Sequence, residues 1–195
     1  PPLNPAEFDA TMMGLAPRLM MAMQVGDDAI LKLVVEIFEE QGFVVKGAHE
    51  VDPSLTAQAG CLTQTPLSKT QQSDADRAVD ILSALSPLDV GQGVVVENGL
   101  CLGIETLRGT DALLGFVAQT PAHLRKPAGV FVKAPKQGQD LRVDMPAIGP
   151  DTVQAAHKAG LSAIVIAAGG VILLNRNETL DAAREAGVSL IVQDM

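Results

Sequence analysis

Apolar residues recur at helical spacing between positions 27 and 41. One face of a 3.6-residue period carries Ile30, Leu33, Val34, Ile37 and Phe38. Asp27 or Asp28 can cap the first turn of such a helix, and Gly42 supplies the residue that ends it. The pattern therefore predicts an amphipathic helix over this segment.

The same spacing predicts two further helices in the middle of the chain. One begins near Ser73, which stands at capping-box spacing from Asp76, and stops at Pro87. Its apolar stripe consists of Val79, Leu82 and Leu85. The other follows Thr110 or Asp111 as its cap and carries Leu113, Leu114 and Val117. A helix start can also bind an anion, although capping is the simpler interpretation of Thr110 and Asp111.

Short apolar runs between turn residues predict strands. Asn98-Gly99 separates two β-rich runs, and both residues suit a type I′ hairpin turn, which needs positive φ at its two central positions. A buried strand is expected at 129–132, and a strand and turn are expected at 43–51. His49, in the latter segment, is interpreted as a structural residue.

The last third of the chain repeats one pattern. "AAHKAGLSAIV" (155–165) and "AAREAGVSLIV" (182–192) each end a helix at Ala-Gly and continue into an apolar strand. Gly169-Gly170 adds a turn before another short strand. Helices that alternate with apolar strands predict an α/β domain with a mixed sheet flanked by helices.

Composition excludes several classes of function. Only 3% of the 195 residues are aromatic and the formal net charge is −9, so binding to nucleic acid is not expected. Cys61 and Cys101 form no metal-ligand spacing or disulfide framework, and we interpret them as small core residues of a cytoplasmic protein. The longest apolar run, 163–174, is too short to cross a membrane.

Two segments have the composition of a flexible apolar surface or of a loop. Five of the seven methionines fall between positions 12 and 23, where Pro17 should kink or end a helix. Such a surface suits either a core-facing helix or an interdomain or lipid-facing contact. The polar stretch 56–72 shows no periodicity and is interpreted as a loop or lid.

The charge distribution indicates where chemistry could occur. Five of the 14 cations lie between positions 125 and 142, against one acid, Asp140. These cations are Arg125, Lys126, Lys133, Lys136 and Arg142. A local excess of positive charge in an acidic protein suits a small anion, and phosphate is the leading candidate because Lys and Arg together can hold phosphoryl oxygens.

Asp144 follows this basic segment in a connection stiffened by Pro135 and Pro146. A carboxylate beside cations could ligate a divalent metal or orient a water for attack on phosphorus. On spacing alone, pairing with Arg142 or capping of the next helix is the simpler interpretation. Gln92 and Gly93, at the mouth of a strand, could present backbone N–H groups to an anion, although a tight turn is the simpler role.

Several motifs, in order, resemble one known family. They are "GDDAILKLVVEIFEEQGFVVKGAHEV", "DVGQGVVVENGLCLGIETLRGTDALL" and "VKAPKQGQDLRVDMPAIGPDTVQAAHKAGLSAIVI". Together they resemble the C-terminal domain of the UDP-2,3-diacylglucosamine pyrophosphatases of lipid A biosynthesis in Gram-negative bacteria, of the type unrelated to calcineurin-like phosphoesterases. The likeness runs from about residue 26 to the end of the chain.

The resemblance implies a magnesium-dependent hydrolysis of UDP-2,3-diacylglucosamine to UMP and 2,3-diacylglucosamine 1-phosphate (lipid X). The catalytic aspartate of the family falls on Asp144, which is also the candidate Mg²⁺ ligand, and its motif neighbours are Lys133, Lys136 and Arg142. The substrate-binding candidates inferred from their own chemistry are Gln92, Gly93, Thr110 and Asp111. A lipid substrate further implies a cytoplasmic protein with peripheral contact to the inner membrane, and a homo-oligomer is compatible with it.

The resemblance also implies a domain organisation. Residues 1–25 are expected to form a Met-rich interdomain segment and residues 26–195 a C-terminal catalytic α/β domain, with the N-terminal Rossmann-like domain of the family absent. On that basis, the chain alone is expected to hydrolyse little or nothing. The rival hypothesis is a non-catalytic module that binds a nucleotide sugar or docks a protein.

Overall fold

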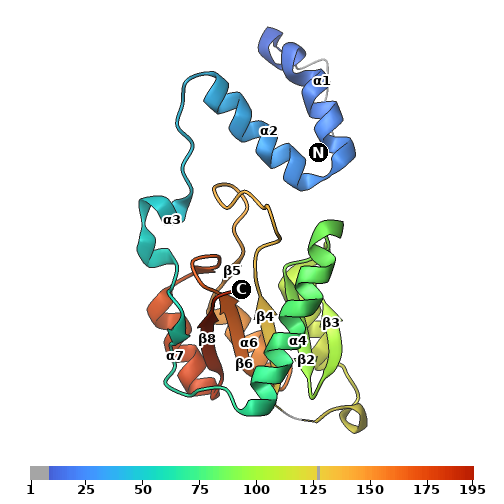
Figure 1. Ribbon diagram of the computed structural model, residues 1–195, viewed down its shortest axis with the longest axis vertical. Helices are drawn as coiled ribbons and strands as arrows, with labels where there is room; N and C mark the ends of the chain where they lie inside the picture. Colours follow the sequence, from blue (N-terminus) through green and yellow to red (C-terminus); the bar gives the residue numbers. More distant parts are fainter. Residues whose placement is uncertain (1–8, 127) are drawn as a thin grey trace. The chain divides into compact units, whose positions relative to one another are not determined.

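The computed structural model describes residues 9–126 and 128–195 (Figure 1). The chain divides into two compact units. The first unit consists of the described part of Pro1–Gly47 together with Asp140–Asp144, and the second of Ala48–Gln139 together with Met145–Met195. Each unit is described by itself.

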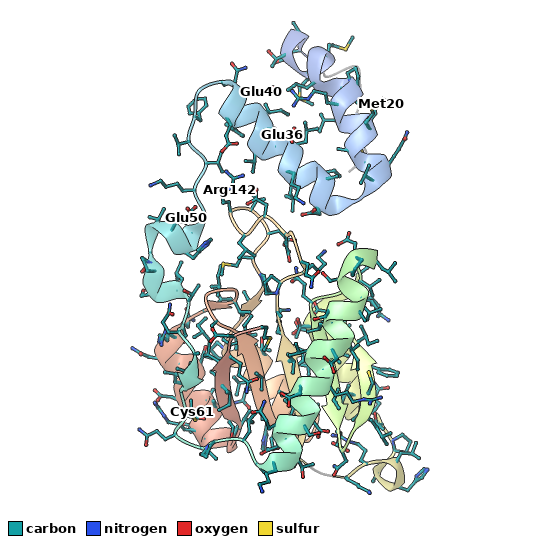
Figure 2. All side chains as sticks on the ribbon, in the orientation of Figure 1. Met20, Glu36, Glu40, Glu50, Cys61 and Arg142 are labelled. Atoms are coloured by element: carbon teal, nitrogen blue, oxygen red, sulfur yellow. The ribbon has the colours of Figure 1, made fainter. Side chains whose placement is uncertain are left out.

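In the first unit, two helices form a pair: α1 (Ala10–Val25) and α2 (Asp27–Glu40). Arg18 of α1 joins them, because its guanidinium lies 2.7 Å from Glu40 and 3.3 Å from Glu36. Figure 2 labels both glutamates on α2. This contact lowers the pKa of the Glu40 carboxyl, chiefly through the hydrogen bond from Arg18.

The predicted helix at 27–41 is confirmed, but its start differs from the prediction. Gly26, with φ of 146°, is the N-cap residue of α2, and no side chain caps the helix. An aspartate cap at 27 or 28 is therefore wrong, since both residues already lie within the first turn. Gly42, with φ of 84°, follows the helix as expected.

Helix α1 continues through Pro17 rather than ending there. A proline removes one backbone hydrogen bond, and the rest of the ladder can form on both sides of it. Four of its methionines are 57–64% exposed: Met13, Met20, Met21 and Met23. These side chains are therefore not core residues of this unit, and an apolar surface lies along the helix.

The second unit is built on a six-stranded mixed sheet with the order β1-β8-β6-β4-β2-β3. Its strands are β1 (Gly60–Cys61), β2 (Gly93–Glu97), β3 (Leu100–Ile104), β4 (Gly129–Lys133), β6 (Leu161–Ala167) and β8 (Ser189–Gln193). Strands β4, β6 and β8 are parallel, whereas β1, β2 and β3 join antiparallel to their neighbours. The predicted mixed α/β sheet is confirmed.

Helices cover both faces of this sheet (Figure 1). They are α4 (Lys69–Leu85), α5 (Gly109–Ala118), α6 (Pro150–Lys158) and α7 (Arg176–Ala186). Alternate residues of the strands face opposite ways, so Val130 and Val132 of β4 belong to one core with residues of α4, while Phe131 belongs to another core with residues of α5, α6 and α7. All three side chains are fully buried, which gives two hydrophobic cores around one sheet.

The repeated pattern of the last third is confirmed. Each copy ends a helix at a glycine with positive φ, 71° at Gly160 and 67° at Gly187, and then enters a buried parallel strand. The strand after Gly169-Gly170 is β7 (Ile172–Leu173). It pairs with β5 (Ala147–Ile148) in a separate two-stranded sheet rather than with the main sheet.

The Asn98-Gly99 turn joins β2 and β3 as predicted, with φ of 49° and 77°. Its backbone is held by Asp74 of α4, which is only 2% exposed. The Asp74 carboxylate accepts hydrogen bonds from the amides of Asn98 (2.8 Å) and Gly99 (2.6 Å). A charged side chain on a helix therefore fixes the position of the hairpin turn.

We expect the Asp74→Ala variant to lose about 2–4 kcal/mol of unfolding free energy, because two amides lose a buried charged acceptor. Urea unfolding measures this change. The control is Asp76→Ala, which removes an exposed carboxylate from the same helix and should cost less than about 0.5 kcal/mol. Equal losses in the two variants would contradict the role of Asp74.

Three local predictions are wrong. Residues 43–47 form no strand, and the next element is α3 (Ala48–Val51). Helix α4 begins at Lys69, and its capping box is formed by Ser68 and Gln71 rather than by Ser73 and Asp76. The earlier start shortens the expected 56–72 loop, which also contributes β1 to the edge of the sheet.

The short 3₁₀ segments are η2 (Pro53–Leu55), η3 (Ser86–Leu88) and η4 (Ala122–Leu124).

Cys61 and Cys101 are both exposed, so their assignment to the core is wrong. They lie on the edge strands β1 and β3, where side chains can face solvent. Among the described residues, no helix has the length and apolar character needed to cross a membrane.

Candidate functional site

The basic segment predicted from the sequence continues past the carboxyl end of β4. Lys133 is the last residue of this strand and pairs in register with Gly93 of the antiparallel strand β2. Strand β4 therefore has a parallel neighbour on one side and an antiparallel neighbour on the other. Open α/β sheets tend to bind ligands outside the carboxyl ends of their parallel strands, so a ligand site is expected at this edge.

Lys133 does not extend into solvent at this edge. It is 5% exposed, and its ammonium lies 3.2 Å from Glu105 Oε2, just beyond the end of β3. The ammonium also donates to Oγ1 of Thr110, and the same hydroxyl lies 3.1 Å from Glu105 Oε2. The three side chains thus form a closed, buried cluster, which we call the Lys133 cluster.

Two glycines leave room for Glu105. A Cβ atom on Gly93 would lie 2.5 Å from Glu105 Oε2, and one on Gly91, whose φ is 61°, would lie 2.0 Å from the Glu105 carbonyl oxygen. Packing around Glu105 therefore explains both glycines. Gln92 lies between them, half-buried, and its carbonyl accepts a hydrogen bond from the Ala134 amide at 2.9 Å.

Neither Thr110 nor Asp111 caps α5 with its side chain. The N-cap position is Arg108, without a side-chain hydrogen bond, so the capping prediction is wrong. The Thr110 hydroxyl is used by the Lys133 cluster instead. Asp111 is exposed in the first turn of the helix.

Lys136 is held at the start of the connection that leaves β4. Its ammonium forms an ion pair with Asp89, the residue after η3, which has φ of 57°. The amide of the next residue, Gln137, donates to Ser86 Oγ at 2.6 Å. Contacts to the end of α4 and η3 therefore fix the first part of this connection within the second unit.

Arg142 and Asp140 form a tight pair in the first unit. The Arg142 Nη2 atom lies 2.7 Å from Asp140 Oδ2, and its Nη1 atom lies 2.7 Å from Glu39 Oε1 on α2. Hydrogen bonding by Arg142 lowers the pKa of the Asp140 carboxyl, and these two carboxylates raise the pKa of Arg142. Arg142 is labelled in Figure 2.

Asp144 lies at the end of the same short segment and is half-buried. Its amide donates to the Asp140 carbonyl at 3.1 Å, as does the Val143 amide at 3.2 Å. The backbone therefore turns tightly from Asp140 to Asp144. Asp144 and Arg142 belong to the first unit, whereas Lys133, Lys136 and Thr110 belong to the second.

The predicted group of five cations is divided by the structure. Arg125 precedes β4, whereas Lys133 ends it, so the two lie toward opposite ends of this strand. Arg125 forms a buried ion pair with Glu97 and donates to the Ala159 carbonyl. It is a structural residue, and a single basic cluster running from Arg125 to Arg142 is wrong.

Within residues 9–126 and 128–195, no group of three or more His, Cys, Asp or Glu side chains is placed to hold a metal ion. Mg²⁺ commonly uses only one or two carboxylates and completes its shell with water and substrate phosphates. A single carboxylate such as Asp144 is chemically compatible with that mode of binding.

Comparisons with known proteins show the family to which this chain belongs. The family description "LpxI C-terminal domain" matches residues 58–191, and "LpxI N-terminal domain" matches residues 1–55. The chain belongs to the LpxI family. A curated relative, UDP-2,3-diacylglucosamine pyrophosphatase LpxI of Caulobacter vibrioides, is 40% identical over 190 residues, which cover 95% of this chain and 68% of that protein.

The N-terminal match corrects one expectation. The resemblance was interpreted as covering a C-terminal domain alone, but the similarity extends over both named domains of the family. The expected inactivity of the chain depended on the absence of the N-terminal domain, and it loses that basis. The boundary predicted at residue 25 stays a prediction.

The sequence analysis missed the role of Glu105. Glu105 was assigned no role from the sequence, yet it is the carboxylate at the centre of the Lys133 cluster. One signal was available: Glu105 and Thr110 stand five residues apart just before and at the start of a predicted helix, and Gly91 and Gly93 lie just before and at the start of an apolar run. Asp89, the partner of Lys136, is the first residue of the second motif quoted above, but it was given no role from the sequence.

Proposed function

We propose that this protein hydrolyses the phosphoanhydride of UDP-2,3-diacylglucosamine to UMP and 2,3-diacylglucosamine 1-phosphate. The observation that carries the proposal is the family membership, together with 40% identity to a relative that is named for this pyrophosphatase activity. The "KAPKQGQDLRVDMP" segment, from Lys133 to Pro146, supplies cations and a carboxylate of the kind that phosphoryl transfer requires.

Asp144 is the proposed catalytic carboxylate. Hydrolysis adds water across the anhydride: an oxygen–phosphorus bond forms, the bond from phosphorus to the bridging oxygen breaks, and both products leave as phosphate monoesters. A carboxylate can orient the attacking water or hold the metal ion that assists the reaction. Tight local turning at Asp140–Asp144 supports this role, because it restricts the backbone that carries the carboxylate.

Cationic side chains are proposed to bind the phosphates. Lys133, Lys136 and Arg142 all belong to the same segment, and each is held by a carboxylate partner. Such pairing keeps long side chains in defined positions before substrate binds. Gln92, Gly93, Thr110 and Asp111 stay as further substrate-binding candidates.

Mg²⁺ is the proposed cofactor, with Asp144 as its protein ligand. When bound, the ion would neutralise charge on the phosphoryl oxygens. Because the substrate carries acyl chains, we further propose that the protein acts at the cytoplasmic face of the inner membrane, through peripheral contact. Binding to nucleic acid is not proposed, in keeping with the net charge of −9.

Release of UMP from UDP-2,3-diacylglucosamine tests this function. With millimolar Mg²⁺, we expect steady UMP formation by the purified protein. With excess EDTA, the rate should fall by about 100-fold or more, and added Mg²⁺ should restore it. The non-catalytic alternative predicts binding of the nucleotide sugar with no UMP under any of these conditions.

A further inference from the structure

We propose that Thr110 and Glu105 are positioning residues that set the affinity of this protein for the phosphates of its substrate, by holding the Lys133 ammonium in position to donate to a phosphoryl oxygen. The inference rests on the proposed function. It assigns a role to Glu105 and a specific mechanism to Thr110, based on the geometry of the Lys133 cluster.

The donor and acceptor count supports this role. An ammonium has three N–H donors. In the described part of the chain, the hydrogen-bond partners of Lys133 Nζ are the Glu105 carboxylate and the Thr110 hydroxyl. The Thr110 hydroxyl can accept from Lys133 and donate to Glu105 at the same time. The two Glu105 contacts are long, at 3.2 Å to Oε2 and 3.5 Å to Oε1, so the N–H that faces Oε1 is the donor that a phosphoryl oxygen can take over.

Burial makes this donor effective. Lys133 and Glu105 are 5% and 8% exposed, so the charged pair is largely shielded from water. A charge-assisted hydrogen bond is stronger in such surroundings than in solvent. An orientation fixed by two partners also lowers the entropic cost of binding, because the long lysine side chain is already ordered.

The cluster lies at the start of the chain segment that carries the other proposed site residues. Lys133 ends β4, and Ala134 begins the connection that carries Lys136, Arg142 and Asp144. Gly91 and Gly93 leave the space that Glu105 occupies beside this strand end. Two independent features, the absence of Cβ atoms and the closed hydrogen-bond triangle, thus keep the ammonium at the carboxyl edge of the sheet.

Thr110 offers the sharpest test because valine matches its shape. Thr110→Val removes the hydroxyl and preserves the volume, whereas Thr110→Ser keeps the hydroxyl. Steady-state kinetics with UDP-2,3-diacylglucosamine should show that KM rises about 10-fold in Thr110→Val while kcat changes less than about threefold, as expected when a binding contact is lost. Thr110→Ser should restore KM to within about threefold of wild type.

Thr106→Val is the matched control, since Thr106 is an exposed threonine in the same segment. The KM of the Thr106→Val variant should equal that of wild type.

If the cluster were only structural, Thr110→Val would lower the melting temperature or the active fraction without raising KM, and this result would overturn the inference. Should Thr110→Val fail to fold, an elevated KM in Thr110→Ala supports the inference and an unchanged KM overturns it. If the wild-type protein shows no turnover, the proposed function fails and the inference falls with it. Turnover with equal KM in all variants overturns the inference alone.

Discussion

Replacing Asp144 with asparagine is expected to lower kcat for UDP-2,3-diacylglucosamine hydrolysis by about 10³-fold or more. Asparagine has nearly the same shape but lacks the negative charge that would hold a metal ion or orient water. The loss should appear mainly in kcat, because the carboxylate is proposed to act in the transition state. Initial rates of UMP release over a range of substrate concentrations measure it.

The fold should survive this change. Asp144 is half-buried, and its amide, which donates to the Asp140 carbonyl, is unaltered by the substitution. Asp151→Asn is the matched control, since Asp151 is an exposed aspartate in the first turn of α6. We expect it to retain wild-type kcat. Turnover by Asp144→Asn within about 10-fold of wild type would remove Asp144 from the proposed mechanism.

Replacing Arg125 with methionine is expected to lower the free energy of unfolding by about 3–5 kcal/mol. The arginine and its partner Glu97 have side-chain exposures of 12% and 2%, so the variant leaves a buried carboxylate without its counter-ion. The Glu97 carboxylate would keep the hydrogen bond from the Lys126 amide to its Oε1 atom, at 2.7 Å. Urea unfolding followed by circular dichroism gives the change.

Arg184→Met is the control for this substitution. Arg184 pairs with Asp181 on the surface of α7, and the loss of such an exposed pair should cost less than about 1 kcal/mol. Where Arg125→Met is still folded, its kcat/KM should equal that of wild type within about twofold. A KM raised 10-fold or more with unchanged stability would instead assign Arg125 to phosphate binding.

The second unit could be predicted well from the sequence where local and tertiary preferences agree. The Asn98-Gly99 turn, the strand at 129–132 and the two helix-Gly-strand repeats were all found from period and turn chemistry. In each of these segments, residues that are neighbours in the sequence determine the backbone conformation. Buried parallel strands are also recognisable because they consist of nearly continuous apolar residues.

The failures arose where a distant contact decided the outcome. Ser73 and Asp76 have capping-box spacing, yet Ser68 and Gln71 cap the helix, and the Gln71 side chain also donates a hydrogen bond to Ser162 of β6. Local spacing does not contain that contact. Residues 43–47 have the apolar character of a strand, but they lie before the second unit and pair with no strand in the described structure.

The candidate site shows the same limit. Excess positive charge between 125 and 142 was read directly from the sequence, but the partners of these cations lie 28 or more residues away in three of the ion pairs. These partners are Glu97, Glu105 and Asp89. The count of charges was correct, whereas their division between structural and site roles depends on the fold.

Observation of both phosphorus nuclei of the substrate tests the central claim most directly. A ³¹P NMR spectrum of UDP-2,3-diacylglucosamine, recorded with the purified protein and Mg²⁺, should lose its two diphosphate signals and gain two monoester signals of equal intensity. The same sample with Asp144→Asn should keep the diphosphate signals. Persistence of the diphosphate with the wild-type protein, while the signals broaden through binding, would contradict hydrolysis and identify a nucleotide-sugar-binding protein.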